Sequence, residues 1–249
     1  MKILLTNDDG INAPGIVAME KELARRGHEL IIIAPLTQQS AASHSISLFK
    51  PMKISNHGEK RYAIDGTPTD CMILGSQLLV DDSIDLVISG INAGQNMGED
   101  VLYSGTVAAA LEAMFLGFKA IAISIAAYEN QKFDTAAKWL ADLLDDNLIE
   151  LIDGNEALNI NVPNIDYEEV RGVRSTRIGH RKYFNFINKQ INENGETEYL
   201  IGGDTPKWQE SEDSDANAVF NNYISITPIS PDFTKTKSLK KINKWINKK

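Results

Sequence analysis

The chain has 249 residues, of which 43% are hydrophobic and 24% are charged, as in a globular protein with one large α/β domain or two small ones. Its net charge of −9 argues against nucleic-acid binding through a broad basic face, and no apolar run is long enough to span a membrane. The single cysteine, Cys71, excludes an intrachain disulfide, and the N-terminus has no secretory apolar core, so we expect a cytoplasmic protein.

Strand and helix patterns alternate along the first half of the chain. In chain order they predict a strand at 2–6, a helix at 14–26, a strand at 29–35, a helix around 71–79, a strand at 85–89, a helix at 104–115, a strand at 119–124, a helix at 133–144 and a strand at 159–163. This alternation is typical of an α/β protein with a doubly wound, mostly parallel sheet, so we expect a Rossmann-like core.

The second half has a different pattern. Residues 177–203 look extended, and Asn194-Gly195 is the signal of a tight hairpin turn. A long hairpin cannot bury its own aromatic rings, so we expect it to pack on another subunit. The rings in question belong to Tyr183, Phe184, Phe186 and Tyr199.

The C-terminal tail from Lys235 holds seven lysines and no acid. Its apolar residues are spaced like one face of a helix, which favours a terminal helix docked on the body. These apolar residues are Leu239, Ile242, Trp245 and Ile246. With no repeat or linker in sight, we expect a single domain over 1–249, with a core at about 1–175, an extended hairpin at about 176–205 and a C-terminal segment at about 206–249.

Three loops leave the carboxyl ends of predicted strands, at residues 7–14, 36–47 and 90–104. Ligands of open α/β sheets bind beyond that edge of the sheet. These loops hold most of the unusual polar residues of the chain, so we expect the chemistry of the protein to lie there.

Two adjacent carboxylates, Asp8 and Asp9, follow the first predicted strand. Like charges repel, and unpaired charge is costly at the end of a buried strand, so a cation between them is favoured. Mg²⁺ and Mn²⁺ prefer carboxylate, amide and hydroxyl oxygens, and Asn92 and Ser40 on the other loops offer an amide and a hydroxyl. Alternatively, one aspartate caps the helix that starts near Pro14 or forms an Asx turn.

Ser104-Gly105-Thr106 opens a predicted helix, where free N–H groups, the helix dipole and two hydroxyls form an anion site. Plain N-capping by Ser104 is the simpler alternative and is compatible with that role. The Gly/Asn-rich stretch 90–98 suits an anion loop or a flexible surface loop equally well, and it is neither a P-loop nor a dinucleotide fingerprint. A cation site and an anion site on neighbouring strand ends together suggest hydrolysis of a phosphate ester.

Other candidate residues carry weaker signals. His44 could shuttle a proton, although a surface histidine is the simpler interpretation, and Cys71 is expected in the core. Residues 65–68 look like a turn. The chain has no Gly-x-Ser-x-Gly motif, which argues against a serine hydrolase.

Five stretches carry a resemblance to a known family: NDDGINAPG, APLTQQSAASHSIS, GTPTDC, SGINAGQNMGEDVLYSGTVAAALEA and DSDANAVFNNYISITPI. In order and spacing they resemble the SurE family of survival proteins, from Met1 to about Ile229. The resemblance implies a Rossmann-like core and a 5'-nucleotidase, a metal-dependent phosphatase of nucleoside monophosphates with one Mg²⁺ or Mn²⁺ per subunit. It also implies a homodimer or homotetramer built through swapped C-terminal elements, with no membrane or nucleic-acid partner.

The resemblance also implies which residues form the site. The family's metal ligands fall on Asp8, Asp9, Ser40 and Asn92. Its phosphate-site residues fall on Asn96, Ser104, Gly105 and Thr106. Ala41 departs from the glycine that usually follows the metal-binding serine, and Ala113 replaces a glycine further along the next helix. Neither change removes a ligand.

We therefore expect metal-assisted attack of water on the phosphate, with Asp8 or Asp9 orienting or deprotonating that water. Two alternatives remain. An aspartyl-nucleophile phosphatase of the haloacid dehalogenase type needs Asp-x-Asp at the strand end, but the aligned pair begins at Asn7, which cannot be that nucleophile. A non-catalytic nucleotide-binding or sensing module could use the same loops.

Overall fold

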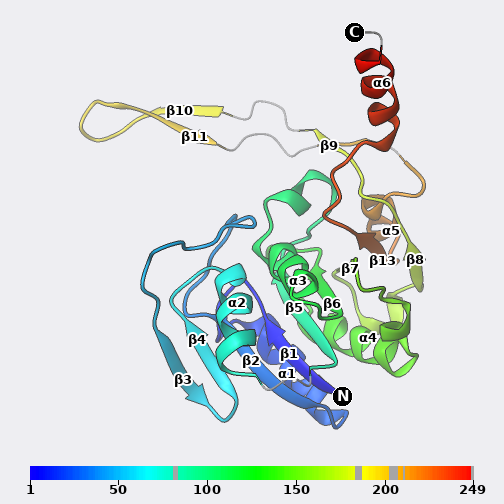
Figure 1. Cartoon of the computed structure of the whole chain (residues 1–249). Coiled ribbons are helices and arrows are strands. Elements are labelled where there is room, and N and C mark those ends of the chain that lie inside the picture. Colours follow the sequence, from blue (N-terminus) through cyan, green and yellow to red (C-terminus); the bar gives the residue numbers. More distant parts are fainter. Residues whose placement is uncertain (81–83, 183–186, 202–206, 210, 248–249) are drawn as a thin grey trace.

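The computed structural model describes residues 1–80, 84–182, 187–201, 207–209 and 211–247. A nine-stranded sheet lies at the centre of these residues (Figure 1). Its strands along the chain are β1 (Lys2–Thr6), β2 (Glu29–Pro35), β3 (Ile54–Gly58), β4 (Arg61–Ile64), β5 (Leu86–Ala93), β6 (Ala120–Ile125), β7 (Ala157–Val162), β8 (Val173–Ser175) and β13 (Ile224–Ile229). In space their order is β3-β4-β2-β1-β5-β6-β7-β13-β8.

The strands from β4 to β7 in this order pair in parallel, while β3 and β13 run antiparallel to β4 and β7. All residues of β6 and β7 are buried, as expected of strands covered on both faces. The predicted α/β, Rossmann-like, mostly parallel fold is therefore confirmed.

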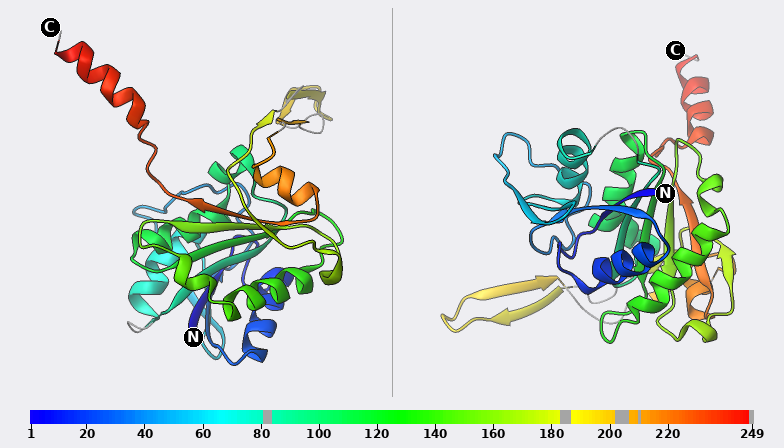
Figure 2. Two further views of the ribbon diagram at one scale, coloured as in Figure 1. Left: turned by 90° about the vertical axis from the view of Figure 1, so that its right-hand side faces the viewer. Right: turned by 90° about the horizontal axis from the view of Figure 1, so that it is seen from below.

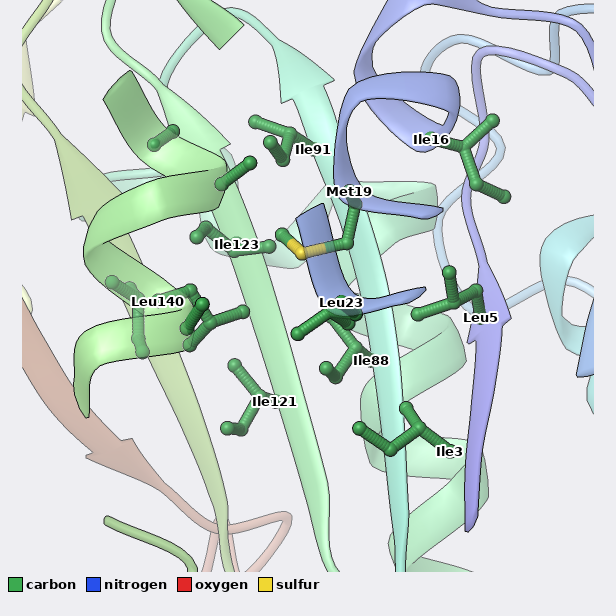
Figure 3. Packing of buried hydrophobic residues seen from close by; sticks show 14 of the residues in the cluster. Ile3, Leu5, Ile16, Met19, Leu23, Ile88, Ile91, Ile121, Ile123 and Leu140 are labelled. Atoms are coloured by element: carbon green, nitrogen blue, oxygen red, sulfur yellow. The ribbon is translucent and has the colours of Figure 1, made fainter. Parts of the chain in front are cut away.

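Helices cover both faces of the sheet. Helices α1 (Pro14–Arg25) and α4 (Phe133–Asp145) pack on one face, and α2 (Pro68–Leu78) and α3 (Gly105–Phe115) pack on the other. In Figure 3, Met19 and Leu23 of α1 and Leu140 of α4 lie over isoleucines of the sheet. These two hydrophobic layers hold the strand ends in fixed positions, and the site depends on that.

Strand β5 is longer than the sequence predicts. The predicted strand ends at residue 89, whereas β5 continues to Ala93 with a register shift against β6. Ile91 is fully buried, and α1 approaches its backbone so closely that a Cβ on Gly15 would lie 1.9 Å from the Ile91 carbonyl oxygen. The extension makes Asn92 part of strand β5, at the carboxyl end of that strand.

The hairpin predicted in the second half is confirmed where it is described. It consists of β10 (Ile187–Ile191) and β11 (Thr197–Ile201), and its turn contains Gly195 with φ 80°. Tyr199 on β11 is exposed, while Tyr183, Phe184 and Phe186 lie outside the described residues. Figure 2 shows the hairpin projecting from the body of the molecule.

The terminal helix forms, but the expected docking on the body is wrong. Helix α6 (Thr236–Ile246) has no buried residue, and Figure 2 shows it pointing away from the sheet. The segment 230–235 leads the chain outward after β13, and this places α6 away from the sheet (Figure 2). None of the helices in the described ranges is long and apolar enough to cross a bilayer.

Candidate functional site

Most of the predicted site residues line one cavity of about 390 Å³ at the carboxyl edge of the parallel strands. The residues that line it are Asp8, Asp9, Ser40, Asn92, Asn96 and Ser104. They come from the ends of β1, β2 and β5 and from the start of α3. Gly105 and Thr106 do not line the cavity and lie behind Asp8.

Asp8 is buried and is held from the side of α3. The hydroxyl of Thr106 donates a hydrogen bond to its Oδ1, and Gly105 packs so closely that a Cβ there would lie 2.9 Å from the Cβ of Asp8. Burial raises the pKa of Asp8 to about 6; the Thr106 hydrogen bond opposes this rise, and the charge of Asp9 adds to it. A bound cation would relieve this unfavourable charge.

Asp9 is held from the side of β5 and from the loop after β2. Its Oδ2 accepts a hydrogen bond from the backbone N–H of Ala93 at 3.0 Å, and burial raises its pKa. The side-chain amide of Gln38 lies 3.5 Å from Asp9 Oδ1 and donates to the hydroxyl oxygen of Ser40 at 2.8 Å. Asp9 and Ser40 are therefore linked through one glutamine.

The local alternatives for the two aspartates are not observed. Ala13, not an aspartate, is the N-cap of α1, and it makes no side-chain capping bond. The turn after β1 is closed by Asn7, whose Oδ1 accepts from the N–H of Gly10 at 3.1 Å. Both carboxylates are thus left facing the cavity.

The two asparagines have different surroundings. Asn92 donates its side-chain amide to the carbonyl of Gly94 at 2.7 Å, and its Oδ1 makes no hydrogen bond within the described residues. Asn96 is buried; its side-chain amide donates to Ser124 Oγ at 2.8 Å. Asn159 and Asn161 of β7 both donate to the backbone carbonyl of Asn96. Two asparagines on one face of a buried strand were the sequence signal that could have predicted these two hydrogen bonds.

The start of α3 has a side-chain N-cap and also backbone N–H groups without a hydrogen-bond partner among the described residues. Ser104 Oγ accepts from the N–H of Val107 at 3.1 Å, so the capping interpretation is confirmed. The N–H groups of Gly105 and Thr106 make no hydrogen bond to any described residue. They remain available to an anion at the positive end of the helix dipole.

Sequence reasoning missed several residues of the cavity. Gln38, Gln95, Asp100, Tyr103, Tyr128 and Arg181 also line it. Arg181 forms an ion pair with Asp100, and its backbone N–H donates to Glu99 at 2.5 Å. These partners are about eighty residues apart in sequence, so no local pattern could have found them.

A buried carboxylate outside the cavity connects two segments that contribute to the cavity lining. Asp215, at the start of α5 (Asp215–Phe220), accepts hydrogen bonds from the N–H groups of Gly98 at 3.0 Å, Gly179 at 2.9 Å and Ala216 at 2.7 Å. This connects the loop after Asn96 to the segment that carries Arg181.

His44 lies outside the cavity. Its Nε2 is 2.8 Å from Glu112, and its ring stacks on Phe115 with centroids 5.9 Å apart. The side chain is 32% exposed, which agrees with a surface histidine. Cys71, in contrast, is buried as predicted.

The donor set fits a hard cation and little else. No group of three His, Cys, Asp or Glu side chains among the described residues could hold a metal ion. An ion in this cavity would therefore combine the carboxylates of Asp8 and Asp9 with neutral oxygens from Ser40 and Asn92, which is the chemistry of Mg²⁺ or Mn²⁺.

The fold and this cavity define an α/β protein with an acidic, oxygen-lined site beside a helix N-terminus. The family model described as survival protein SurE matches residues 3–185. The chain belongs to the SurE family.

The chain is similar in sequence to known proteins along nearly its whole length. A protein named 5'-nucleotidase SurE from Natranaerobius thermophilus is 41% identical over 98% of this chain and 98% of its own. Its namesake from Haemophilus influenzae is 42% identical over 99% of this chain and 98% of its own. The crystal structure of the SurE protein from Aquifex aeolicus superposes with a TM-score of 0.88 at 38% identity, over 98% of this chain and 99% of that one.

Proposed function

We propose that the chain is a divalent-metal-dependent 5'-nucleotidase that hydrolyses nucleoside monophosphates to nucleoside and phosphate. One observation carries the proposal: two neighbouring carboxylates, Asp8 buried and Asp9 partly buried, share a cavity with neutral oxygen ligands, beside the open N–H groups of α3. The name shared by the similar proteins, 5'-nucleotidase, supports the same activity.

Asp8, Asp9, Ser40 and Asn92 would hold one ion, Mg²⁺ or Mn²⁺, in each subunit. Such an ion would stabilise the charged form of Asp8, whose pKa burial raises, and it would give a partner to the open Oδ1 of Asn92. When bound, a divalent ion supplies Lewis-acid polarisation of the phosphate and of a nearby water.

The other residues bind and orient the substrate. Ser104 lines the cavity and would contact the phosphate directly, while the backbone N–H groups of Gly105 and Thr106 just behind it, unpartnered among the described residues, would reach the equatorial oxygens from the start of α3. The α3 dipole favours the negative charge that grows there. Asn96 keeps a second side-chain N–H for the phosphate, because only one is used by Ser124. Asp8 or Asp9 orients the attacking water and accepts its proton.

The test is release of phosphate from AMP with added Mn²⁺ or Mg²⁺, in the wild type and in Asp9→Asn. We expect activity that a chelator abolishes and a loss of roughly a hundredfold or more in the variant, since the substitution replaces a charged carboxylate ligand with a neutral amide. Asp146→Asn is the matched control, because that aspartate is exposed at the end of α4. Near-normal activity of Asp9→Asn, with Mn²⁺ binding intact by calorimetry, contradicts the assignment.

Two further outcomes would redirect the proposal. Quenching a turnover of labelled substrate leaves label on the protein if an aspartate is the nucleophile, and leaves none if water attacks directly. AMP binding without any phosphate release, across the divalent metals, indicates a nucleotide-sensing module instead.

We also infer that the chain forms a homodimer or homotetramer through the β10–β11 hairpin and α6. Both elements expose apolar side chains, including Ile187 and Ile191 on the hairpin and Leu239 and Ile242 on the helix. Such faces are normally covered in a stable protein. Sedimentation analysis of the full chain and of a chain ending at residue 235 tests this, and a monomeric full chain contradicts it.

A further inference from the structure

Two tyrosines at the cavity differ from the other residues that line it. Tyr103 and Tyr128 are 62% and 64% exposed. Neither ring stacks on an aromatic ring or a cation among the described residues, and neither hydroxyl has a hydrogen-bond partner there. Both tyrosines thus expose more than half of their surface at the cavity that holds Asp8 and Asp9.

Tyr128 is held in place by the backbone of the Gly/Asn loop. A Cβ on Gly94 would lie 2.5 Å from Tyr128 Cε1 and 2.9 Å from Cδ1, so the ring rests directly against that glycine. The N–H of Gly94 donates to the carbonyl of Ile125 at 3.1 Å, which fixes the glycine to the end of β6, three residues before Tyr128. Any side chain at position 94 would displace the ring.

Tyr103 is held by two other segments. It follows the 3₁₀ turn η1 (Gly98–Leu102), and its N–H donates to the carbonyl of Asp100 at 3.0 Å. Its own carbonyl accepts from the N–H of Ser43 at 3.0 Å. Because Tyr103 directly precedes Ser104, its ring is attached next to the start of α3.

The rest of the cavity lining offers no comparable surface. Apart from the two tyrosines, Ala41 and Ala93, every lining residue is polar or charged. Arg181, the other planar group, is engaged with Asp100. A planar apolar portion of a ligand therefore has the two tyrosine rings as its partners.

We propose that Tyr103 and Tyr128 stack on the nucleobase of the substrate and so distinguish nucleotides from phosphate esters that lack a base. This deepens the proposed nucleotidase function and rests on it for the identity of the substrate. Stacking on an aromatic ring tolerates every base, because each base has a π-face. The site therefore accepts all nucleoside monophosphates and binds purines, with their larger rings, more tightly.

The first test is binding of adenosine to the protein in the presence of a chelator, followed by calorimetry. Adenosine has no phosphate, so its affinity reports the base site alone. We expect Tyr128→Leu and Tyr103→Leu each to weaken binding about tenfold, as loss of one stacking partner does. Tyr128→Phe keeps the ring and should bind as the wild type does.

Phe49→Leu is the matched control, since it removes a fully exposed aromatic ring that does not line the cavity. Its adenosine affinity should equal that of the wild type. The thermal unfolding midpoint of every variant is recorded, and Tyr103→Leu keeps the proposal testable should Tyr128→Leu fail to fold.

The second test compares kcat/KM for AMP with kcat/KM for ribose 5-phosphate, which lacks the base. The leucine variants should lower the ratio of these two values about tenfold. Equal adenosine affinity in the wild type and both leucine variants, or no adenosine binding at all, overturns the proposal. Absence of phosphate release from both esters refutes the nucleotidase function instead, while ring-dependent adenosine binding still upholds the stacking site.

Discussion

The hydroxyl of Thr106 donates a hydrogen bond to Oδ1 of Asp8 across 98 residues of sequence. It joins the first turn of α3 to the end of β1, and both side chains are buried. The bond orients one carboxylate of the proposed metal site and offsets part of the rise in its pKa that burial causes. Helix α3 is thus connected to both halves of the site, the cation half and the anion half.

Replacing Thr106 by valine should disturb Asp8 through that bond. Thr106→Val keeps the shape but removes the donor, so the pKa of Asp8 rises further above its present value of about 6. A hydrogen bond to a charged group contributes about 1.5–3 kcal/mol, so we expect the titration profile of the Asp8 carboxyl, followed by NMR in the metal-free protein, to move up by about one pH unit or more. Thr106→Ser retains the hydroxyl and should keep the wild-type profile; identical profiles for valine and serine contradict this role.

Gly105→Ala should crowd Asp8 directly. The added Cβ would lie 2.9 Å from Asp8 Cβ and 3.1 Å from Pro68 Cγ, so one of them must shift. Overpacking of this kind costs about 1–3 kcal/mol, and we expect a matching loss in urea unfolding together with a fall in kcat/KM. Gly154→Ala is the control, because no atom lies within 4 Å of its Cβ. If both alanine variants unfold at the same urea concentration, the close packing is not as described.

The metal-free protein should lose stability as the pH rises from about 4 to about 6. Because the pKa of Asp8 is raised from 3.8 to about 6 on folding, its contribution to stability is present below pH 3.8 and is lost as the pH rises through about 6. Asp8→Asn removes this titration, so with a chelator present we expect it to unfold at higher urea than the wild type at pH 8, by roughly 1–3 kcal/mol. At pH 4.5 the difference should largely disappear. A difference independent of pH would show that Asp8 ionises normally.

Asp215→Ala should loosen the far wall of the cavity. Three buried N–H groups, of Gly98, Gly179 and Ala216, lose their acceptor, so we expect the free energy of unfolding to fall by about 2–4 kcal/mol. KM for AMP should rise more than kcat falls, because the walls that carry Asn96 and Arg181 move. Asp213→Ala, two residues earlier, removes an exposed carboxylate and should leave the free energy of unfolding nearly unchanged. Equal effects of the two variants argue against this role of Asp215.

The parts of the fold that are buried on both faces could be predicted from the sequence. Strands β2 (ELIIIAP) and β6 (AIAISI) are apolar apart from Glu29 and Ser124, which is typical of strands covered on both faces. Strand β3 was missed because all of its residues are exposed, so it has no apolar pattern. The apolar stripe of α6 predicted its helical form correctly, but a stripe does not specify which surface covers it.

The residues of the candidate site also fall into two groups, those that local sequence patterns predict and those that they do not. Asp8, Asp9 and the Ser104 cap lie at element ends, where short-range sequence rules apply, and the structure places them at one cavity. The contact of Arg181 with Asp100 and those of Asp215 with Gly98 and Gly179 form only when the second half of the chain folds over the first. No local pattern encodes such contacts.

The central sheet ends in two edges that are poor templates for further strands. At one side β3 is short, polar and broken by a bulge at Asn56 and Gly58; at the other β8 has three residues. Open edges of long regular strands invite neighbouring chains to add on, which leads to fibres. Molecules of this protein can therefore crowd together at high concentration without extending one another's central sheets.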